Sequence, residues 1–150
     1  MLRLSMALAA SVVLVLGCDS GPKLIDVDCT LTVGGKPVDK IRVEFWPEGN
    51  GPRSIGETDA QGKFKLLSDD GKKGALLGKH KVVLRDVGIL STKVVGRAAE
   101  DVDLTEGRKP RIANLYEDPQ KSPLSAEVSA DQKTIELQAE PGPGTTVAGP

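Results

Sequence analysis

The stretch Ile25-Asp26-Val27-Asp28-Cys29-Thr30-Leu31-Thr32-Val33 alternates apolar and polar residues without a break. Its odd-numbered residues are apolar, and its even-numbered residues are aspartates and threonines. Successive side chains of a β-strand point to opposite faces, so this period of two predicts a half-buried strand over 25–33. Cys29 belongs to the apolar face and is therefore expected to lie in a core.

The same alternation returns directly downstream of this strand. Gly34-Gly35-Lys36-Pro37 supplies a turn, because glycine adopts positive φ angles without steric cost. A second strand is predicted over 41–46, and Pro47 ends it. Its inward positions are Ile41, Val43 and Phe45, and its outward positions are Arg42, Glu44 and Trp46.

Further strand signals follow along the chain, separated by turns that contain glycine, aspartate and serine. They cover residues 54–58, 63–67, 79–85, 124–128 and 134–138. In the segment 79–85, His80 shares a face with Val82 and Leu84. Short strands in this rhythm, with almost no helical periodicity, predict an all-β sandwich.

Two segments depart from the strand rhythm. Residues 86–118 form a long connection in which 87–95 fits a strand or an extended loop, and 97–106 fits one or two helical turns. A connection of this length in a compact domain is typical of functional or mobile loops. Residues 139–150 are rich in proline and glycine, and their composition predicts a disordered tail.

The N-terminus has the features of an export signal. Arg3 precedes the apolar run from Met6 to Leu16, and Gly17-Cys18 follows it. This order is typical of a bacterial lipoprotein signal, in which residues 1–17 are removed and Cys18 carries a lipid. The apolar run is shorter than the roughly 20 residues of a spanning helix. An ordinary secretory signal, which would leave Cys18 free, is the alternative.

This interpretation divides the chain of 150 residues into four parts. They are a signal at 1–17, a lipidated cysteine and polar tether at 18–23, a β-sandwich domain at 24–138, and the tail at 139–150. The protein is expected to be anchored on the extracytoplasmic side of a cell membrane, facing the periplasm or the cell surface. Asp19 favours retention at the inner membrane where the sorting rule known for some bacteria applies.

The charge balance excludes one class of partner. The chain has 20 basic and 21 acidic residues, and removal of Arg3 with the signal leaves 19 against 21, a net charge of −2. Nucleic-acid binding requires a basic surface, so no nucleic acid is expected as a partner. With a lipid on Cys18, Cys29 is left as a solitary thiol, and no disulfide is expected.

Three segments resemble the carboxypeptidase-regulatory-like, or transthyretin-like, β-sandwich domains. They are Val33-Gly-Gly-Lys-Pro-Val38 with Val43-Glu-Phe-Trp-Pro47, then Gly56-Glu-Thr-Asp-Ala-Gln-Gly-Lys-Phe-Lys-Leu66, then Gly78-Lys-His-Lys-Val-Val-Leu84. The segment from Arg111 to Pro119, with Ser122-Pro-Leu124, is similar to the C-terminal part of small bacterial lipoproteins that carry this domain. There, proline and lysine usually stand where this chain has Ala113 and Leu115.

The resemblance implies a single antiparallel sandwich of seven strands or a similar number, like prealbumin. Such domains are usually non-catalytic and serve as structural, adhesion or ligand-binding modules, so no enzyme activity and no cofactor are expected. The transthyretin-like hydroxyisourate hydrolase uses several histidines and a C-terminal Tyr-Arg-Gly-Ser. This chain ends in Val-Ala-Gly-Pro150 and has one histidine.

The candidate chemical groups favour structural roles. His80, the only histidine, lies in phase with the core positions, and zinc would need more ligands than His80 and Cys29. A buried Cys29 thiol would be inert. Asp69, Asp70 and Asp59 are expected to be solvated turn residues, because Lys72 and Lys73 would repel a calcium ion.

Two aromatic residues are the candidates for ligand binding. Trp46 faces outward by phase, where it would stack on a sugar or partner, or else cover its own hairpin. Tyr116 carries the same two interpretations, with structural packing favoured. The main hypothesis is an interaction or structural module with an unknown envelope protein as partner. The alternative is a carbohydrate or small-ligand module that uses Trp46 and the 86–118 loop.

Overall fold

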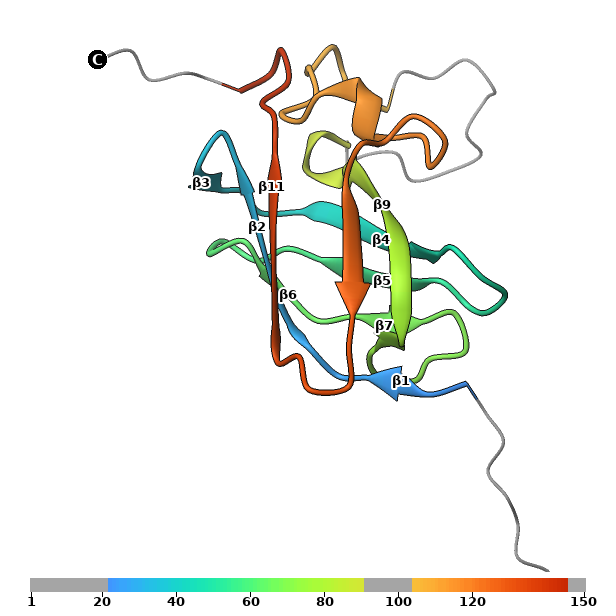
Figure 1. Cartoon of the computed structure of the whole chain (residues 1–150). Helices are drawn as coiled ribbons and strands as arrows, with labels where there is room; N and C mark the ends of the chain where they lie inside the picture. The colour runs from blue at the N-terminus through green and yellow to red at the C-terminus, as the bar shows by residue number, and fades with distance from the viewer. Residues whose placement is uncertain (1–21, 91–103, 146–150) are drawn as a thin grey trace, which may run out of the picture.

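The computed structural model describes residues 22–90 and 104–145. Eleven strand segments and two single-turn 3-10 helices occur in this part of the chain (Figure 1). The strands are β1 (Leu24–Ile25), β2 (Asp28–Val33), β3 (Lys36–Pro37), β4 (Ile41–Pro47), β5 (Ser54–Glu57), β6 (Lys63–Phe64), β7 (Leu67–Ser68), β8 (Ala75–Leu76), β9 (Gly78–Asp86), β10 (Ser125–Val128) and β11 (Thr134–Ala139). The 3-10 helices are η1 (Val87–Ile89) and η2 (Asn114–Tyr116).

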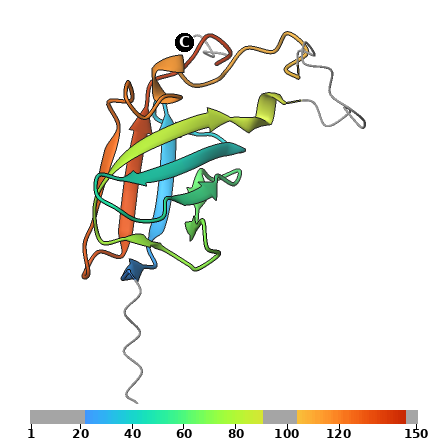
Figure 2. The ribbon, with the colours of Figure 1, turned by 90° about the vertical axis from the view of Figure 1, so that its right-hand side faces the viewer.

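The strands form two packed layers, which Figure 2 shows from the side, and the predicted all-β sandwich is confirmed. One layer has the order β10-β9-β4-β5-β7, and its pairs are antiparallel. The other places β11 and β3 beside β2, which also pairs with β6. A small sheet of β1 and β8 lies at the end of the sandwich where the described chain begins (Figure 1).

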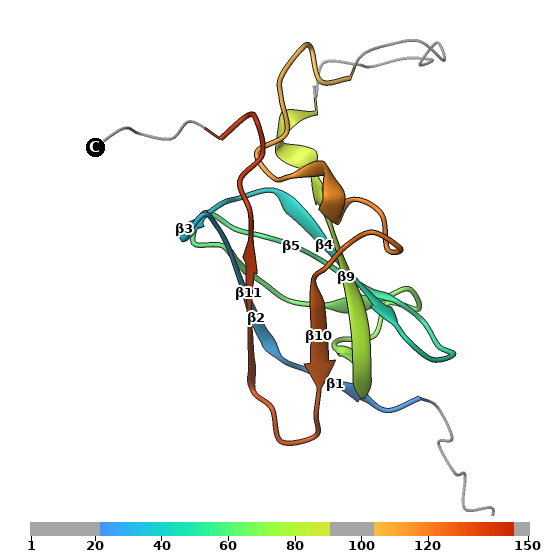
Figure 3. The ribbon, with the colours of Figure 1, turned by 45° about the horizontal axis from the view of Figure 1, so that its top comes forward.

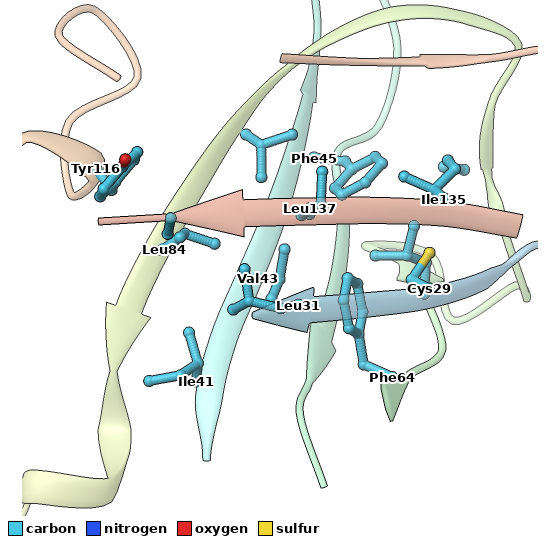
Figure 4. Close-up of a cluster of buried hydrophobic side chains, with 14 of the residues drawn as sticks. Cys29, Leu31, Ile41, Val43, Phe45, Phe64, Leu84, Tyr116, Ile135 and Leu137 are labelled. Carbon is cyan, nitrogen blue, oxygen red and sulfur yellow. The ribbon is translucent and has the colours of Figure 1, made fainter. Parts of the chain in front are cut away.

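The core lies between the layers and consists of the inward positions of both (Figure 4). Alternation predicted these positions correctly on four strands, whose buried members include Leu31, Val33, Ile41, Val43, Phe45, Val82, Leu84, Ile135 and Leu137. Burial of this apolar surface is the main force that holds the layers together.

Strand β11 differs from the predicted antiparallel arrangement. It pairs with β2 in parallel, with Ile135 beside Cys29 and Leu137 beside Leu31. The loop between β10 and β11 passes from one layer to the other, so β11 joins the second layer running in the direction of β2 (Figure 3). Two predicted strands are also split, since 25–33 divides into β1 and β2, and 63–67 divides into β6 and β7.

The end of the sandwich domain also differs from the prediction. Residues 140–145, expected to be part of a disordered tail, fold back on the segment that precedes η2. The N–H groups of Gly142 and Gly144 donate to the carbonyls of Arg111 and Pro110, at 2.9 and 2.8 Å. Strand β11 ends at Ala139. Because residues 140–145 are held by these hydrogen bonds, the ordered domain extends to Thr145. The predicted tail beyond Thr145 lies outside the described residues.

The long connection at 86–118 begins as the 3-10 helix η1 and ends with η2. The strand or loop predicted for 87–95 is a 3-10 turn over Val87–Ile89. The remainder of that segment from residue 91, and most of the helical turns predicted at 97–106, lie outside the described residues.

Candidate interaction site

The outer face of the five-stranded sheet carries a buried carboxylate. Arg42, Glu44 and Trp46 alternate onto this face of β4, as their sequence phase predicts. Glu44, however, is only 4% exposed, so its outward position does not give it access to water. It lies directly opposite Val83 of β9, which is fully buried on the same face. A buried charge is costly unless it is paired and hydrogen-bonded.

Three side chains from different segments satisfy the Glu44 carboxylate. Arg85 of β9 donates from Nε to Oε1 at 3.2 Å. Arg53, from the loop before β5, lies with its Nη1 3.3 Å from Oε2, and the Trp46 indole Nε1 donates to the same oxygen at 3.1 Å. Charge-assisted hydrogen bonds of this kind are stronger than neutral ones, so the carboxylate holds the cluster together.

Trp46 is partly buried and engaged inside this cluster. The guanidinium carbon of Arg53 lies over its ring at 5.2 Å from the centroid, which is cation–π geometry. The same guanidinium donates from Nε to both oxygens of Asp69 at 3.1 Å. One face of the Trp46 ring is therefore covered by Arg53, and the side chain serves first to cover its own sheet.

Arg42 is an exposed cation on the outer face, with a charged residue on each neighbouring strand. It lies directly opposite Arg85 of β9 and, on its other side, directly opposite Glu57 of β5. Arg85 has Glu44 as its counterion, but no described residue forms a salt bridge with Arg42. Like charges facing one another across two strands are unfavourable. Arg42, exposed and without an ion pair among the described residues, is therefore available to an acidic partner.

Replacing Glu44 with glutamine is expected to destabilise the domain by about 1–3 kcal/mol, because two arginines and the Trp46 indole lose a charged acceptor. Urea unfolding measures the loss, and Trp46 fluorescence reports the change at the cluster itself. Glu57→Gln is the matched control, since Glu57 is an exposed carboxylate on the neighbouring strand. Equal midpoints for the two variants would contradict this role of Glu44.

Tyr116 is buried in the core, so it is not available as the ligand-binding residue that the sequence allowed. Its side chain is 4% exposed and lies in the core cluster, where Leu84 is its labelled neighbour in Figure 4. Its hydroxyl oxygen accepts a hydrogen bond from the N–H of Glu140 at 3.0 Å. Tyr116 presents no face to a ligand, because its ring is used to close the core and its hydroxyl to hold the C-terminal segment.

His80 is buried, as its phase with Val82 and Leu84 predicts. It is 1% exposed, and its ring lies 5.6 Å from that of Phe45. Its Nδ1 lies 3.1 Å from the carbonyl oxygen of Gly78, so Nδ1 carries the proton of the neutral ring. Nε2 has no hydrogen-bond partner among the described residues. Burial lowers the pKa of His80, against the smaller opposing effects of the Gly78 carbonyl and Glu48.

The domain is expected to lose stability as the pH falls below the ordinary histidine pKa of 6.5. The unfolded chain takes up the His80 proton first, because the folded pKa is lower, so acid favours unfolding. Thermal unfolding of wild type and His80→Gln at pH 7 and pH 5 measures this effect. The wild type should lose more stability than the variant over that interval. Equal losses of stability in wild type and His80→Gln would contradict this role of His80.

Cys29 is one of the residues that line an open groove, but its thiol is unreactive. The groove has a volume of about 710 Å³ and is lined by Asp28, Cys29, Thr30, Glu57, Asp59, Lys63, Phe64, Lys65 and Thr134. Cys29 itself is 2% exposed, and burial raises the pKa of its thiol to about 12. The thiolate is the reactive form of cysteine, so this side chain acts as a small core residue.

The turn aspartates have local partners. The Asp59 carboxylate accepts hydrogen bonds from the N–H groups of Gln61 and Lys63, each at 2.9 Å. Asp70 accepts the hydroxyl of Ser68, and this hydrogen bond lowers the pKa of Asp70. Within residues 22–90 and 104–145, no three histidine, cysteine, aspartate or glutamate side chains are grouped to hold a metal ion.

An ion-pair cluster that alternation does not reveal holds the long connection in place. Arg111 donates from Nη2 to Asp86 Oδ1 at 2.7 Å and from Nε to Asp86 Oδ2 at 3.0 Å. It also reaches Asp39, from Nη1 to Oδ1 at 3.0 Å. The hydrogen bonds to Asp86 raise the pKa of Arg111 further. Only tertiary structure brings these residues together, since Arg111 is 25 and 72 positions away from its two partners.

Comparison with protein-family models, with curated proteins and with solved structures finds no match for this chain. Among the described residues, no helix has the length and apolar character needed to cross a bilayer.

Proposed function

We propose that this protein is a lipid-anchored, extracytoplasmic lipoprotein whose β-sandwich is a non-catalytic interaction module. The observation that carries the proposal is Gly17-Cys18 at the end of an apolar run, directly before a folded domain that begins at Leu24. The order of motifs that resembles transthyretin-like lipoprotein domains supports the same assignment.

The chemistry of the described residues supports an interaction role over catalysis. His80, the only histidine in the chain, is buried and cannot reach a substrate at the surface. The Cys29 thiol is buried as well, with its pKa raised to about 12. On the outer face of the five-stranded sheet, Arg42 is exposed and has no salt-bridge partner among the described residues. An acidic surface of an envelope protein is the partner that suits this face.

Affinity capture from the envelope fraction tests the interaction role. Wild type is expected to retain a specific protein that Arg42→Glu releases, because the substitution reverses the charge at the centre of the face. Lys36→Glu is the matched control, since Lys36 is an exposed cation on β3 of the other layer. Equal capture by all three proteins would contradict the assignment of this face.

Carbohydrate or small-ligand binding at Trp46 and the 86–118 loop is the weaker proposal. A sugar ring would have to stack on an indole that Arg53 already covers on one side. Binding to a glycan array by wild type, lost in Trp46→Ala, would favour this alternative over a protein partner.

A further inference from the structure

We propose that the end of the sandwich formed by β1, β8 and residues 67–77 is a contact surface for an anionic phospholipid bilayer. This inference rests on the proposed lipid at Cys18 and names the orientation that the anchored domain adopts. The surface consists of Lys23, Leu67, Lys72, Lys73 and Leu77, all exposed.

The length of the tether restricts which part of the domain can meet the membrane. Six residue steps separate Cys18 from Leu24, the first residue of β1. A fully extended chain covers about 3.4 Å per residue, so the lipidated residue lies at most about 20 Å from β1. Strand β1 lies at one end of the sandwich and η2 at the other in both Figure 1 and Figure 2. The β1 end therefore faces the bilayer.

The segment 67–77 contacts β1 at this end through its last four residues. It leaves β7 at the edge of the five-stranded sheet and leads into β9, and its strand β8 pairs with β1 on the way. Gly74 packs against the carbonyl of Ile25, and the N–H of Leu77 donates to the carbonyl of Lys23 at 3.2 Å. The backbones of Leu67 and Lys73 form an isolated antiparallel β-bridge. The exposed side chains of this segment are therefore held around the point where the tether enters the domain.

Two leucines give the surface its apolar character. Leu67 is 49% exposed and Leu77 is 50% exposed, although the leucine directly before each of them, Leu66 and Leu76, is buried. Isolated exposed leucines are common on soluble domains. Here Leu77 lies next to Lys23, to whose carbonyl its N–H donates, and Leu67 belongs to β7 at the same end of the sandwich. An apolar side chain that enters the boundary between headgroups and acyl chains loses its contact with water.

The charges of the surface favour anionic lipid. Both carboxylates of the segment are already neutralised: Asp69 by Arg53 at 3.1 Å, and Asp70 by Lys72 at 3.4 Å. Asp26 and Asp28, which follow β1, share Lys65 at 3.3 and 2.7 Å. Lys23 and Lys73 form no salt bridge with any described residue, so the two lysines outweigh the one carboxylate that Lys65 leaves unbalanced. Exposed lysines near a membrane surface are attracted to anionic headgroups, and each contributes roughly fivefold to binding.

The test uses the full lipidated protein reconstituted into vesicles and labelled at a single introduced cysteine. Leu77→Cys carries an environment-sensitive fluorophore, and Leu115→Cys on η2 is the matched control, because Leu115 is an exposed leucine at the opposite end. Cys29 does not compete for the label, since it is buried and its thiol pKa is about 12. The vesicles contain either phosphatidylglycerol or only phosphatidylcholine.

The label at position 77 is expected to gain about twofold in emission on phosphatidylglycerol vesicles, and the label at position 115 to stay unchanged. Lys23→Glu with Lys73→Glu should reduce the gain to the level seen on phosphatidylcholine. A lipidated protein whose label at position 77 behaves like that at 115, or responds equally to both lipids, would overturn this inference alone. A protein without lipid on Cys18 would overturn the anchor as well.

Discussion

Replacing Cys18 with serine is expected to move the protein from the membrane fraction to the soluble fraction almost completely. In the proposed anchor the lipid is joined to the cysteine sulfur by a thioether, and a serine hydroxyl would not take the place of that sulfur. Acyl chains contribute about 0.8 kcal/mol per buried CH₂, so a multiply acylated cysteine holds a domain of this size on a bilayer very firmly. Fractionation followed by carbonate or high-salt washing measures the change.

Cys29→Ser is the matched control for this experiment. Cys29 is the other cysteine of the chain and lies in the core, so its replacement should lower stability but leave the protein on the membrane. The proposed bilayer contacts at the β1 end would be too weak to retain the domain through a high-salt wash, because screening weakens electrostatic attraction to the surface. A Cys18→Ser protein that stays in the membrane fraction would contradict the lipid anchor.

Replacing Arg111 with methionine is expected to destabilise the domain by about 3–5 kcal/mol, the usual result of leaving one member of a buried ion pair without its partner. The side chain of Asp86 is 1% exposed and would lose its counterion. Arg111 also fixes the segment on which residues 140–145 fold, so its loss weakens two parts of the domain. Urea unfolding with the single Trp46 as the probe measures the effect.

Arg108→Met is the control for Arg111, because Arg108 lies three positions away and makes an exposed ion pair with Glu106 at 3.8 Å. Exposed pairs of this kind contribute less than about 1 kcal/mol. Arg111→Lys should recover only part of the stability, since an ammonium group cannot reproduce the two-point contact with Asp86. Equal unfolding midpoints for the methionine variants would contradict the account of this cluster.

Alternation of side chains was a reliable guide to the core wherever a strand contributes one face to it. Phe45, Leu84 and His80 are buried as their phase predicts. The same reasoning failed for Glu44, because phase gives the direction of a side chain and not what covers it. Its partners Arg53 and Arg85 are 9 and 41 residues away in the sequence, and only the strand register brings them over the carboxylate.

Composition misjudged the start of the predicted tail for a related reason. A run of glycine and proline lacks apolar side chains and therefore predicts disorder. Gly142 and Gly144 nevertheless lie so close to the carbonyls of Ile112 and Lys109 that a Cβ atom on either glycine would clash with the carbonyl oxygen beside it. The absence of a side chain is what permits this backbone packing. A residue count contains no information about such close approach.

The candidate site could be predicted only in part. The sequence predicts Trp46 as a surface aromatic, but no local pattern reveals the register that places Arg42 between Arg85 and Glu57. The buried Tyr116 was harder to judge, because a single tyrosine within a long connection has no periodic neighbours. Its burial depends on the C-terminal segment that its hydroxyl binds through Glu140.

The mass of the N-terminal peptide of the native protein is the most direct test of the central claim, a lipid anchor on Cys18. The account predicts a peptide that begins at Cys18, lacks residues 1–17, and exceeds its sequence mass by a diacylglyceryl group, with or without a further acyl chain on the amine. An unmodified Cys18, or an N-terminus at any other residue, would contradict the anchor and the membrane-facing orientation that depends on it.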